Sequence, residues 1–193
     1  MKQLPLWVND LLSEHRVKRY QVYLRRKGRP PKDSLKLPLP LLCAIDAGKT
    51  TGVALLSPAW AVVLEADDED FLFAELFFTH LSKARKVKAK VCIESGFCPC
   101  ADAVYRAGVY TGLAFANKLI PALIHPNAKA QIFKQTPLSV KRLLLTQAFQ
   151  PFNLALSKTV GEGYFQHAAD ALGITFAYLR HNHNIPTPTI RLF

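Results

Sequence analysis

The central part of the chain alternates short apolar runs with longer segments whose apolar residues recur at helical spacing. Aliphatic runs bounded by Gly and polar turn residues predict a hairpin over 41–56 and further strands at 60–64, 88–95 and 120–125. Apolar residues three and four apart predict helices at 71–84, 101–117, 138–149 and 163–180. Three antiparallel strands followed by alternating helices and strands predict an α/β fold, a mixed five-stranded sheet flanked by helices.

Residues 1–40 have a different pattern from the rest of the chain. They contain ten basic residues and three acidic ones, and apolar residues over 4–24 are loosely spaced as in a basic amphipathic helix. We therefore divide the chain into a basic N-terminal arm at 1–40, one main domain at 41–182 and a C-terminal tail at 183–193.

A Gly-Arg-Pro sequence interrupts the arm. The segment 25–33, RRKGRPPKD, resembles the AT-hook, with Gly28, Arg29 and Pro30 at the core and Lys27 where the family usually has Arg. The resemblance implies insertion into the minor groove of A·T-rich DNA, where negative potential attracts arginine. The alternative is a proline-stiffened basic linker that contacts only phosphates. Both interpretations predict the same DNA-binding side chains: Arg25, Arg26, Lys27, Arg29 and Lys32.

The overall composition favours a polyanionic partner. The formal charge is +11 and the pI is near 9.7, which indicates nucleic acid as the leading candidate. No apolar run approaches the roughly 20 residues that span a bilayer, and Asp10 and Glu14 are unlike a signal peptide. The four cysteines form neither a CxxC pair nor a zinc pattern, so we expect no disulfides and an intracellular, DNA-associated protein.

Carboxylates interrupt the apolar pattern at the ends of two predicted strands and in the last predicted helix. Asp46 and Glu94 each end an apolar strand, where a carboxylate is costly to bury unless it is paired or binds a cation. Asp46 could instead open the turn, and Glu94 could cap the next helix. His167 and Asp170 are three residues apart on one face of the last predicted helix, among alanines that allow close approach to a sheet. His167 could also be an ordinary core histidine.

Together these residues supply three carboxylates and an imidazole from three separated elements. Such donors suit Mg²⁺ or Mn²⁺, and two such ions can activate water and stabilise the leaving oxygen in phosphodiester hydrolysis. The acidic run at 67–70 lies before a predicted helix, so we interpret it as a cap and a solvated turn rather than a metal site.

Three motifs over 41–181 are similar to those of the RuvC-type Holliday junction resolvases of the RNase H-like superfamily. AIDAGKTTGVALL at 44–56 matches the first strand-turn-strand, VCIESGF at 91–97 the second motif, and HAADALGITFAYL at 167–179 the terminal helix in its histidine variant. The segment 105–130 resembles the family's helix, strand and Pro-x-x-Lys, with Pro126 and Lys129.

The resemblance implies an RNase H-like fold and a metal-dependent endodeoxyribonuclease that resolves four-way junctions as a homodimer. The implied metal ligands are Asp46, Glu94, His167 and Asp170, holding Mg²⁺ that Mn²⁺ can replace. Lys129 would be a catalytic phosphate contact and Phe97 an aromatic that stacks at the junction. Where the family often has a Gly-rich basic stretch, Lys141 and Arg142 would contact DNA. The bacterial members have no counterpart of the arm.

Other classes of protein share parts of the pattern. AGKT resembles the end of a phosphate-binding P-loop, but that motif requires Gly where this chain has Cys43. Sugar-kinase-like proteins have a similar hairpin but need a second domain. A nuclease of the same fold acting on other branched DNA or on RNA-containing substrates stays open, since fold does not fix function. A DNA-binding module without catalysis also stays open, although it would not require the carboxylates.

Overall fold

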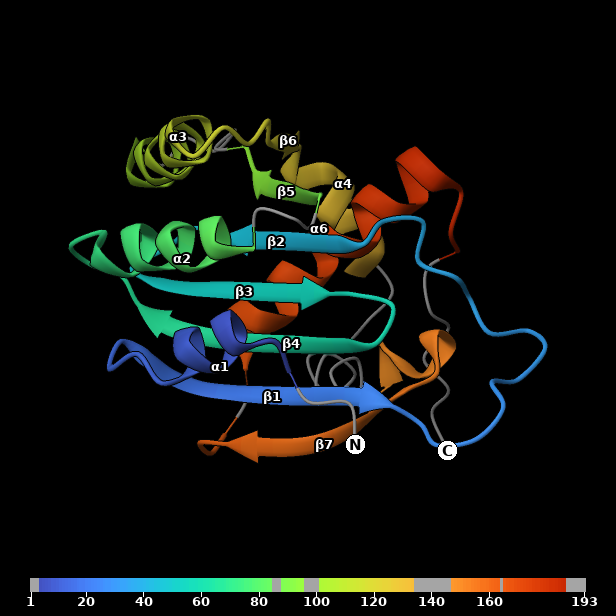
Figure 1. Ribbon diagram of the computed structural model, residues 1–193. Helices are drawn as coiled ribbons and strands as arrows, with labels where there is room; N and C mark the ends of the chain where they lie inside the picture. The colour runs from blue at the N-terminus through green and yellow to red at the C-terminus, as the bar shows by residue number, and fades with distance from the viewer. Residues whose placement is uncertain (1–3, 85–87, 96–100, 134–146, 164, 187–193) are drawn as a thin grey trace.

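A seven-stranded mixed sheet forms the centre of the protein (Figure 1). The computed structural model describes residues 4–84, 88–95, 101–133, 147–163 and 165–186. The strand order is β6-β5-β2-β3-β4-β1-β7. In chain order the strands are β1 (Val17–Arg25), β2 (Leu41–Asp46), β3 (Thr50–Leu56), β4 (Trp60–Asp67), β5 (Ala89–Glu94), β6 (Ala122–Ile124) and β7 (Leu154–Val160). The predicted mixed sheet with flanking helices is confirmed, with two strands more than expected.

The middle of the sheet follows the predicted order. β2, β3 and β4 are antiparallel neighbours, and β5 and β6 add parallel strands on the other side of β2. Parallel strands need crossover connections, and α2 (Leu72–Lys83) and α3 (Ala101–Ala116) lie within them. The predicted hairpin at 41–56 is present, with Asp46 opposite Gly52.

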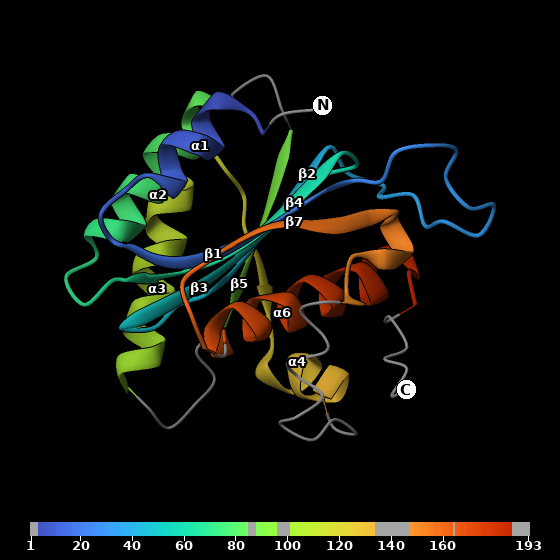
Figure 2. The ribbon, with the colours of Figure 1, turned by 90° about the horizontal axis from the view of Figure 1, so that it is seen from below.

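Helices cover both faces of the sheet (Figure 2). On one face lie α6 (Gln166–His183) and α4 (Pro126–Phe133), and on the other lie α1 (Leu6–Leu12), α2 and α3. Each face has its own apolar core. Cys92 lies in the core under α6 and Cys43 in the opposite one, because side chains alternate between the faces of a sheet, and both are free thiols. Cys98 and Cys100 lie outside the described residues.

The helix predicted over 4–24 is wrong beyond Leu12. Residues Val17–Arg25 form β1, which pairs with β4 on one side and with β7 on the other. Val and Tyr recur through this segment, and such residues favour a pleated, half-buried surface. Val22 and Tyr23 are buried in opposite cores, so the strand is covered on both faces. Nine residues of the segment that we assigned to a basic arm are therefore part of the sheet.

The remaining connections differ from the prediction in smaller ways. Neither the strand β7 nor the helix α4 was predicted. Together, β1 and β7 extend the sheet past the expected five strands. α4 begins with Pro126, a residue that suits the first helical position because its missing N–H has no partner there. The helix predicted at 138–149 lies mostly outside the described residues. No described helix is long and apolar enough to span a bilayer.

The acidic run at 67–70 is only in part the solvated cap that we predicted. Asp70 accepts a hydrogen bond from the Leu72 N–H at the start of α2, as expected. Asp68 is fully buried and accepts from the Ala74 N–H at 3.1 Å and from the Tyr110 hydroxyl at 2.7 Å. The solvated interpretation is wrong for Asp68, because α3 packs its tyrosine over this loop.

This buried network also supports the turn that follows Asp46. The Tyr110 hydroxyl donates to Asp68 and lies 3.1 Å from the Thr51 hydroxyl, which donates to the Gly48 carbonyl at 2.9 Å. The Arg106 guanidinium is also buried and donates to the Asp68 carbonyl at 2.7 Å. Burial raises the pKa of Asp68, against the opposing effect of the Tyr110 hydrogen bond. The turn at the end of β2 is thus held from the face opposite α6.

Candidate active site

One transverse row of the sheet brings the site together. Strands β5 and β2 are in parallel register with Ile93 beside Ile45, so the next residues, Glu94 and Asp46, end neighbouring strands. Across the antiparallel strands the row continues through the pairs Asp46–Gly52, Gly52–Glu65 and Glu65–Arg19. Residues paired in this way share one face of a sheet, and here that face is the one covered by α6. The predicted proximity of Asp46 and Glu94 is therefore a consequence of strand register.

Lys129 of α4 lies between the two carboxylates. Its ammonium is 2.6 Å from Glu94 Oε2 and 3.5 Å from Asp46 Oδ1. All three side chains are mostly buried, with 15–18% of their surfaces exposed. Burial alone would lower the pKa of Lys129, but the Asp46 charge, the Glu94 hydrogen bond and the Asp170 charge together raise it. Lys129 is therefore a cation held at the point where two strands present acidic groups.

The two carboxylates have pKa values shifted in opposite directions. Burial acts to raise the pKa of Asp46, but the His167 hydrogen bond and the Lys129 charge outweigh it and lower that pKa. Burial raises the pKa of Glu94, and the neighbouring Asp46 charge adds to this against the lowering effect of Lys129. Two acids with pKa values pushed apart can hold different protonation states at one pH, which is a frequent property of acid-base sites.

The last helix contributes His167 and Asp170. His167 Nδ1 lies 3.2 Å from Asp46 Oδ2, and this hydrogen bond raises the pKa of the imidazole despite its partial burial. Asp170 is one turn further along α6 and half-buried. Its charge raises the pKa of both His167 and Lys129, so it acts on the same cluster. The structure thus brings together Asp46, Glu94 and His167 as predicted, with Asp170 electrostatically coupled to them.

Gly52 allows α6 to approach the row closely. A Cβ atom at this position would lie within 1.9 Å of the His167 carbonyl oxygen and 2.8 Å from the Ala168 nitrogen. Such distances are impossible for a real side chain, so the helix backbone rests directly on the glycine. Because Gly52 is the register partner of Asp46, this contact also sets the imidazole beside the carboxylate.

Glu65 is a site residue that the sequence analysis missed. It is 1% exposed, and its Oε1 accepts from the backbone N–H groups of His167 at 2.7 Å and Ala168 at 3.1 Å. These N–H groups belong to the first turn of α6, which has no side-chain cap from its own N-cap residue. A carboxylate also interacts favourably with the positive end of the helix dipole. Glu65 therefore anchors the helix that carries His167.

Arg19 of β1 balances the charge of Glu65. Its Nε and Nη2 lie 2.7 and 2.6 Å from Glu65 Oε2, and its Nη1 donates to the Glu162 carbonyl at 3.0 Å. The guanidinium also lies over the Phe165 ring, 5.2 Å from its centre. The signal that could have identified this pair was the single Glu within the apolar run WAVVLEAD, beyond the end that we assigned to the strand.

The cluster around Lys129 offers the oxygen donors of a divalent-ion site. Among the described residues, no group of three or more His, Cys, Asp or Glu side chains is arranged ready to hold a metal ion. The Lys129 ammonium takes the place between Asp46 and Glu94 that a cation would occupy. The chemistry nevertheless fits, because carboxylate oxygens that already hold one cation are the donors that Mg²⁺ and Mn²⁺ prefer.

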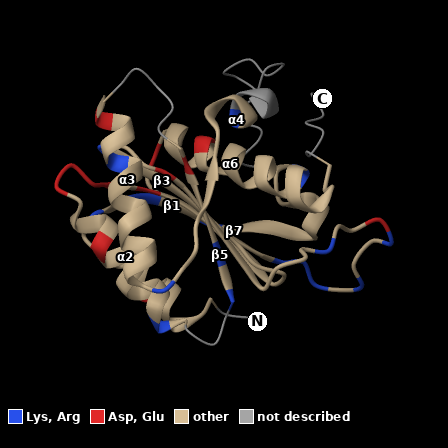
Figure 3. Cartoon of the chain, turned by 90° about the horizontal axis from the view of Figure 1, so that it is seen from above, with Lys and Arg blue, Asp and Glu red and all other residues tan. Residues whose placement is uncertain are grey.

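The other predicted DNA-binding residues fall elsewhere. Phe97, Lys141 and Arg142 lie outside the described residues. Arg25 ends β1, six residues beyond Arg19, which places it about 20 Å from the transverse row at the rise of an extended strand. The exposed residues Arg26, Lys27, Arg29 and Lys32 follow in the loop between β1 and β2. The basic segment therefore lies at the opposite end of the sheet from the candidate active site (Figure 3).

Solved structures similar to this chain include two of the RuvC protein from T. thermophilus. The structure in complex with a Holliday junction substrate has a TM-score of 0.45 and 15% identity, covering 72% of this chain and 91% of that chain. A second RuvC structure has a TM-score of 0.46 and 18% identity, covering 72% and 95%. No protein-family model and no curated protein sequence matches the chain.

Proposed function

We propose that this protein is a divalent-metal-dependent endodeoxyribonuclease that resolves four-way DNA junctions as a homodimer. The proposal is carried by one observation, the meeting of Asp46, Glu94, Lys129 and His167, from four different elements, at one end of the sheet. The motif resemblance described above supplies the substrate class, and the positive charge of the chain agrees with a polyanionic substrate.

The acidic residues of the cluster would hold the metal. Asp46 and Glu94 are the proposed principal ligands, with His167 and Asp170 completing the set. Mg²⁺ bound there, or Mn²⁺ in its place, would polarise the phosphodiester and activate water, with two ions as the arrangement that we favour. With the carboxylates holding the metal, Lys129 would be available to bind the substrate phosphate. His167 would stay hydrogen-bonded to Asp46 through Nδ1 and use its other ring nitrogen either as a metal ligand or to orient the attacking water and accept its proton.

Several parts of the chain serve this chemistry indirectly. Gly52 and Glu65 fix the first turn of α6 and so the direction of the imidazole. The buried contacts of Tyr110 and Arg106 hold the turn after Asp46. Preorganised groups need no rearrangement at the moment of reaction, which is where much of the rate enhancement of enzymes arises.

The decisive experiment compares cleavage of four-way junctions, flaps, RNA–DNA hybrids and plain duplex in Mg²⁺. We expect junctions to be cut fastest, and Asp46→Asn and Glu94→Gln to abolish cutting while junction binding survives. A neutral amide keeps the shape of the side chain but loses metal affinity. Lys88→Gln, which removes an exposed charge at the start of β5, is the control and should cut normally. Full activity of either carboxylate variant would exclude this site.

A second candidate function is DNA binding without catalysis. The observation that favours it is the Lys129 ammonium, which already neutralises Asp46 and Glu94. In that case the cluster would be a structural ion-pair network, and no substrate would be cut in Mg²⁺ or Mn²⁺. Faster cutting of flaps or hybrids than of junctions would instead indicate a nuclease with a different substrate.

A further inference from the structure

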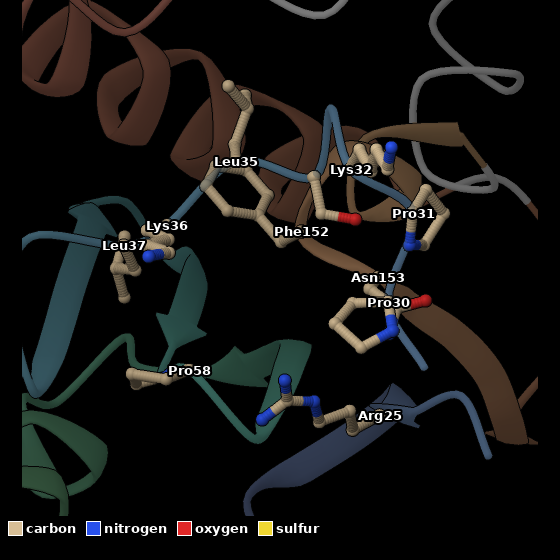
Figure 4. Close-up of a pocket in the computed structure, with 11 residues that line it drawn as sticks. Arg25, Pro30, Pro31, Lys32, Leu35, Lys36, Leu37, Pro58, Phe152 and Asn153 are labelled. Atoms are coloured by element: carbon tan, nitrogen blue, oxygen red, sulfur yellow. The ribbon is translucent and has the colours of Figure 1, made fainter. Parts of the chain in front are cut away.

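A basic pocket, whose lining residues are drawn in Figure 4, lies at the end of β1, away from the candidate active site. It has a volume of about 390 Å³, in the range of ligand pockets. Its walls come from the end of β1, from residues 30–37, from the turn between β3 and β4, and from the residues just before β7. The basic lining residues are Arg25, Lys32 and Lys36, and no acidic side chain lines the pocket among the described residues.

The segment that forms one wall is fastened to the body of the protein. The Arg26 N–H donates to the Asn153 carbonyl at 3.0 Å, and the Leu35 N–H donates to the Pro151 carbonyl at 2.7 Å. A turn between them is closed by a hydrogen bond from the Ser34 N–H to the Pro31 carbonyl at 3.0 Å. Backbone hydrogen bonds therefore fix both ends of the segment, and the exposed side chains of Arg25, Lys32 and Lys36 line the space that it encloses.

Asn153 gives the pocket its polar floor. Its backbone closes a short 3₁₀ turn (Gln150–Phe152) in the left-handed conformation, with φ of 58°, which explains a preference for Asn or Gly here. The backbone conformation does not explain the side-chain amide. The residue is 5% exposed and lines the pocket. Within the described part of the chain, this amide has no hydrogen-bond partner. The amide atoms are not among the fully buried side-chain atoms without a partner, so they are open to the pocket and can bond to a group that enters it.

We propose that this pocket binds a nucleotide unit of DNA. The three cations suit a phosphate. The side chains of Pro30, Leu35 and Phe152 offer an apolar wall for a sugar or base face, and the Asn153 amide offers adjacent donor and acceptor atoms for a base edge. Charge complementarity favours this occupant over an apolar or cationic one. The site goes beyond the proposed nuclease activity, because it needs neither the metal nor the transverse row.

The test measures binding of a fluorescent single-stranded oligo(dA) by the full chain in EDTA. We expect Asn153→Gly, which tolerates the positive φ, to weaken binding about five- to tenfold, as loss of a hydrogen bond to a buried group predicts. Asn153→Asp, which also tolerates that φ but adds a negative charge, should weaken it further. Lys36→Gln should lower the salt slope of binding by about 0.7, the value for one single-strand phosphate. Lys88→Gln is the matched control and should change little.

Two further arms decide what is bound. If a single nucleotide fills the pocket, deoxyadenosine monophosphate should compete with the oligonucleotide. Binding of the free nucleotide without binding of the strand would instead indicate a small-molecule site of the same chemistry. Inorganic phosphate should compete much more weakly. Wild-type binding by both Asn153 variants, with normal thermal unfolding, would overturn the proposal and leave water as the partner of the amide. Junction cleavage by those variants reports separately on the proposed function.

Discussion

The backbone of His167 rests on Gly52, with no room between them for even a methyl group. A Cβ on Gly52 would fall within 1.9 Å of the His167 carbonyl oxygen. The same glycine is the cross-strand partner of Asp46, whose carboxylate holds the His167 imidazole at 3.2 Å. One residue without a side chain thus sets the distance between a sheet and a helix that meet at the candidate active site.

Gly52→Ala should displace the start of α6 and separate the imidazole from Asp46. We expect the free energy of unfolding to fall by about 1 to 3 kcal/mol, typical of overpacking in a core. Urea unfolding measures this change, and the chemical shifts of the His167 ring report the local displacement. Gly112→Ala, in a helix where a Cβ meets nothing within 4 Å, is the control and should not destabilise. Equal stability of the two variants would show that α6 does not rest on Gly52 in solution.

Lys129→Met should destabilise the metal-free protein near neutral pH. The ammonium lies 2.6 Å from Glu94 and 3.5 Å from Asp46, and its removal leaves the two carboxylates without the cation between them. We expect a decrease of about 1.5 to 3 kcal/mol in the free energy of unfolding, the range for hydrogen bonds to charged groups. Added Mg²⁺ should restore more stability to this variant than to the wild type. Thermal unfolding with and without Mg²⁺ measures both effects, and indifference of the variant to Mg²⁺ would contradict a metal site.

The contribution of His167 to the free energy of unfolding should decrease as pH rises. Its pKa is raised above 6.5 in the folded chain, chiefly by the Asp46 hydrogen bond. The protonated ring therefore stabilises the fold fully below about 6.5, and this contribution is lost as pH rises through the raised pKa. Comparison of the wild type with His167→Asn by urea unfolding in EDTA should show a difference at acidic pH that fades at alkaline pH.

The same protonation should oppose catalysis. A protonated imidazole cannot bind a metal ion or accept a proton, so cleavage by the wild type should fall as pH drops through the raised pKa. His167→Asp should retain activity and shift the preference towards Mg²⁺, since an imidazole nitrogen binds the softer Mn²⁺ better than it binds Mg²⁺. Near wild-type rates for His167→Ala at every pH would instead leave a site of three carboxylates.

Glu65→Ala should be among the most destabilising single changes in the described core. It would leave the Arg19 guanidinium without its buried partner and the first N–H groups of α6 without an acceptor. Breaking a buried pair from one side typically costs about 3 to 5 kcal/mol. The double variant Glu65→Leu with Arg19→Leu should recover part of that stability. Urea unfolding of the two variants measures the difference, and a mild effect of Glu65→Ala alone would mean that α6 is anchored by other contacts.

The basic loop between β1 and β2 should contribute to DNA affinity through charge. Replacing Arg26, Lys27 and Arg29 by Gln should lower the salt slope of duplex binding by about 0.9 for each phosphate that the loop no longer neutralises, with the fold intact. Under the AT-hook interpretation, Arg29→Ala weakens binding to A·T-rich sites more than to G·C-rich ones, whereas a linker loses affinity for both equally. Deletion of residues 1–25 cannot serve as this test, because it removes β1 from the sheet.

The candidate site was predictable where its residues broke an apolar pattern. Asp46 and Glu94 stand out as carboxylates at the ends of buried strands, and His167 and Asp170 as polar groups among alanines. Glu65 also breaks an apolar run but lies beyond the end that we assigned to its strand, and its pairing with Arg19 of another strand leaves no local pattern. β1 was missed because its Val and Tyr residues satisfy helical spacing as well as alternation. β7 is an edge strand, largely exposed, and depends on β1 for its assignment.

The transverse row also determines when during folding a competent site can exist. Arg19, Glu65 and His167 come from the beginning, the middle and the end of the chain, and their hydrogen bonds close loops of 46 and 102 residues. Contacts so distant in sequence form slowly and late. Without the N-terminal part Glu65 loses its Arg19 partner, and without the C-terminal part α6 itself is missing, so we expect nuclease activity only from the complete fold.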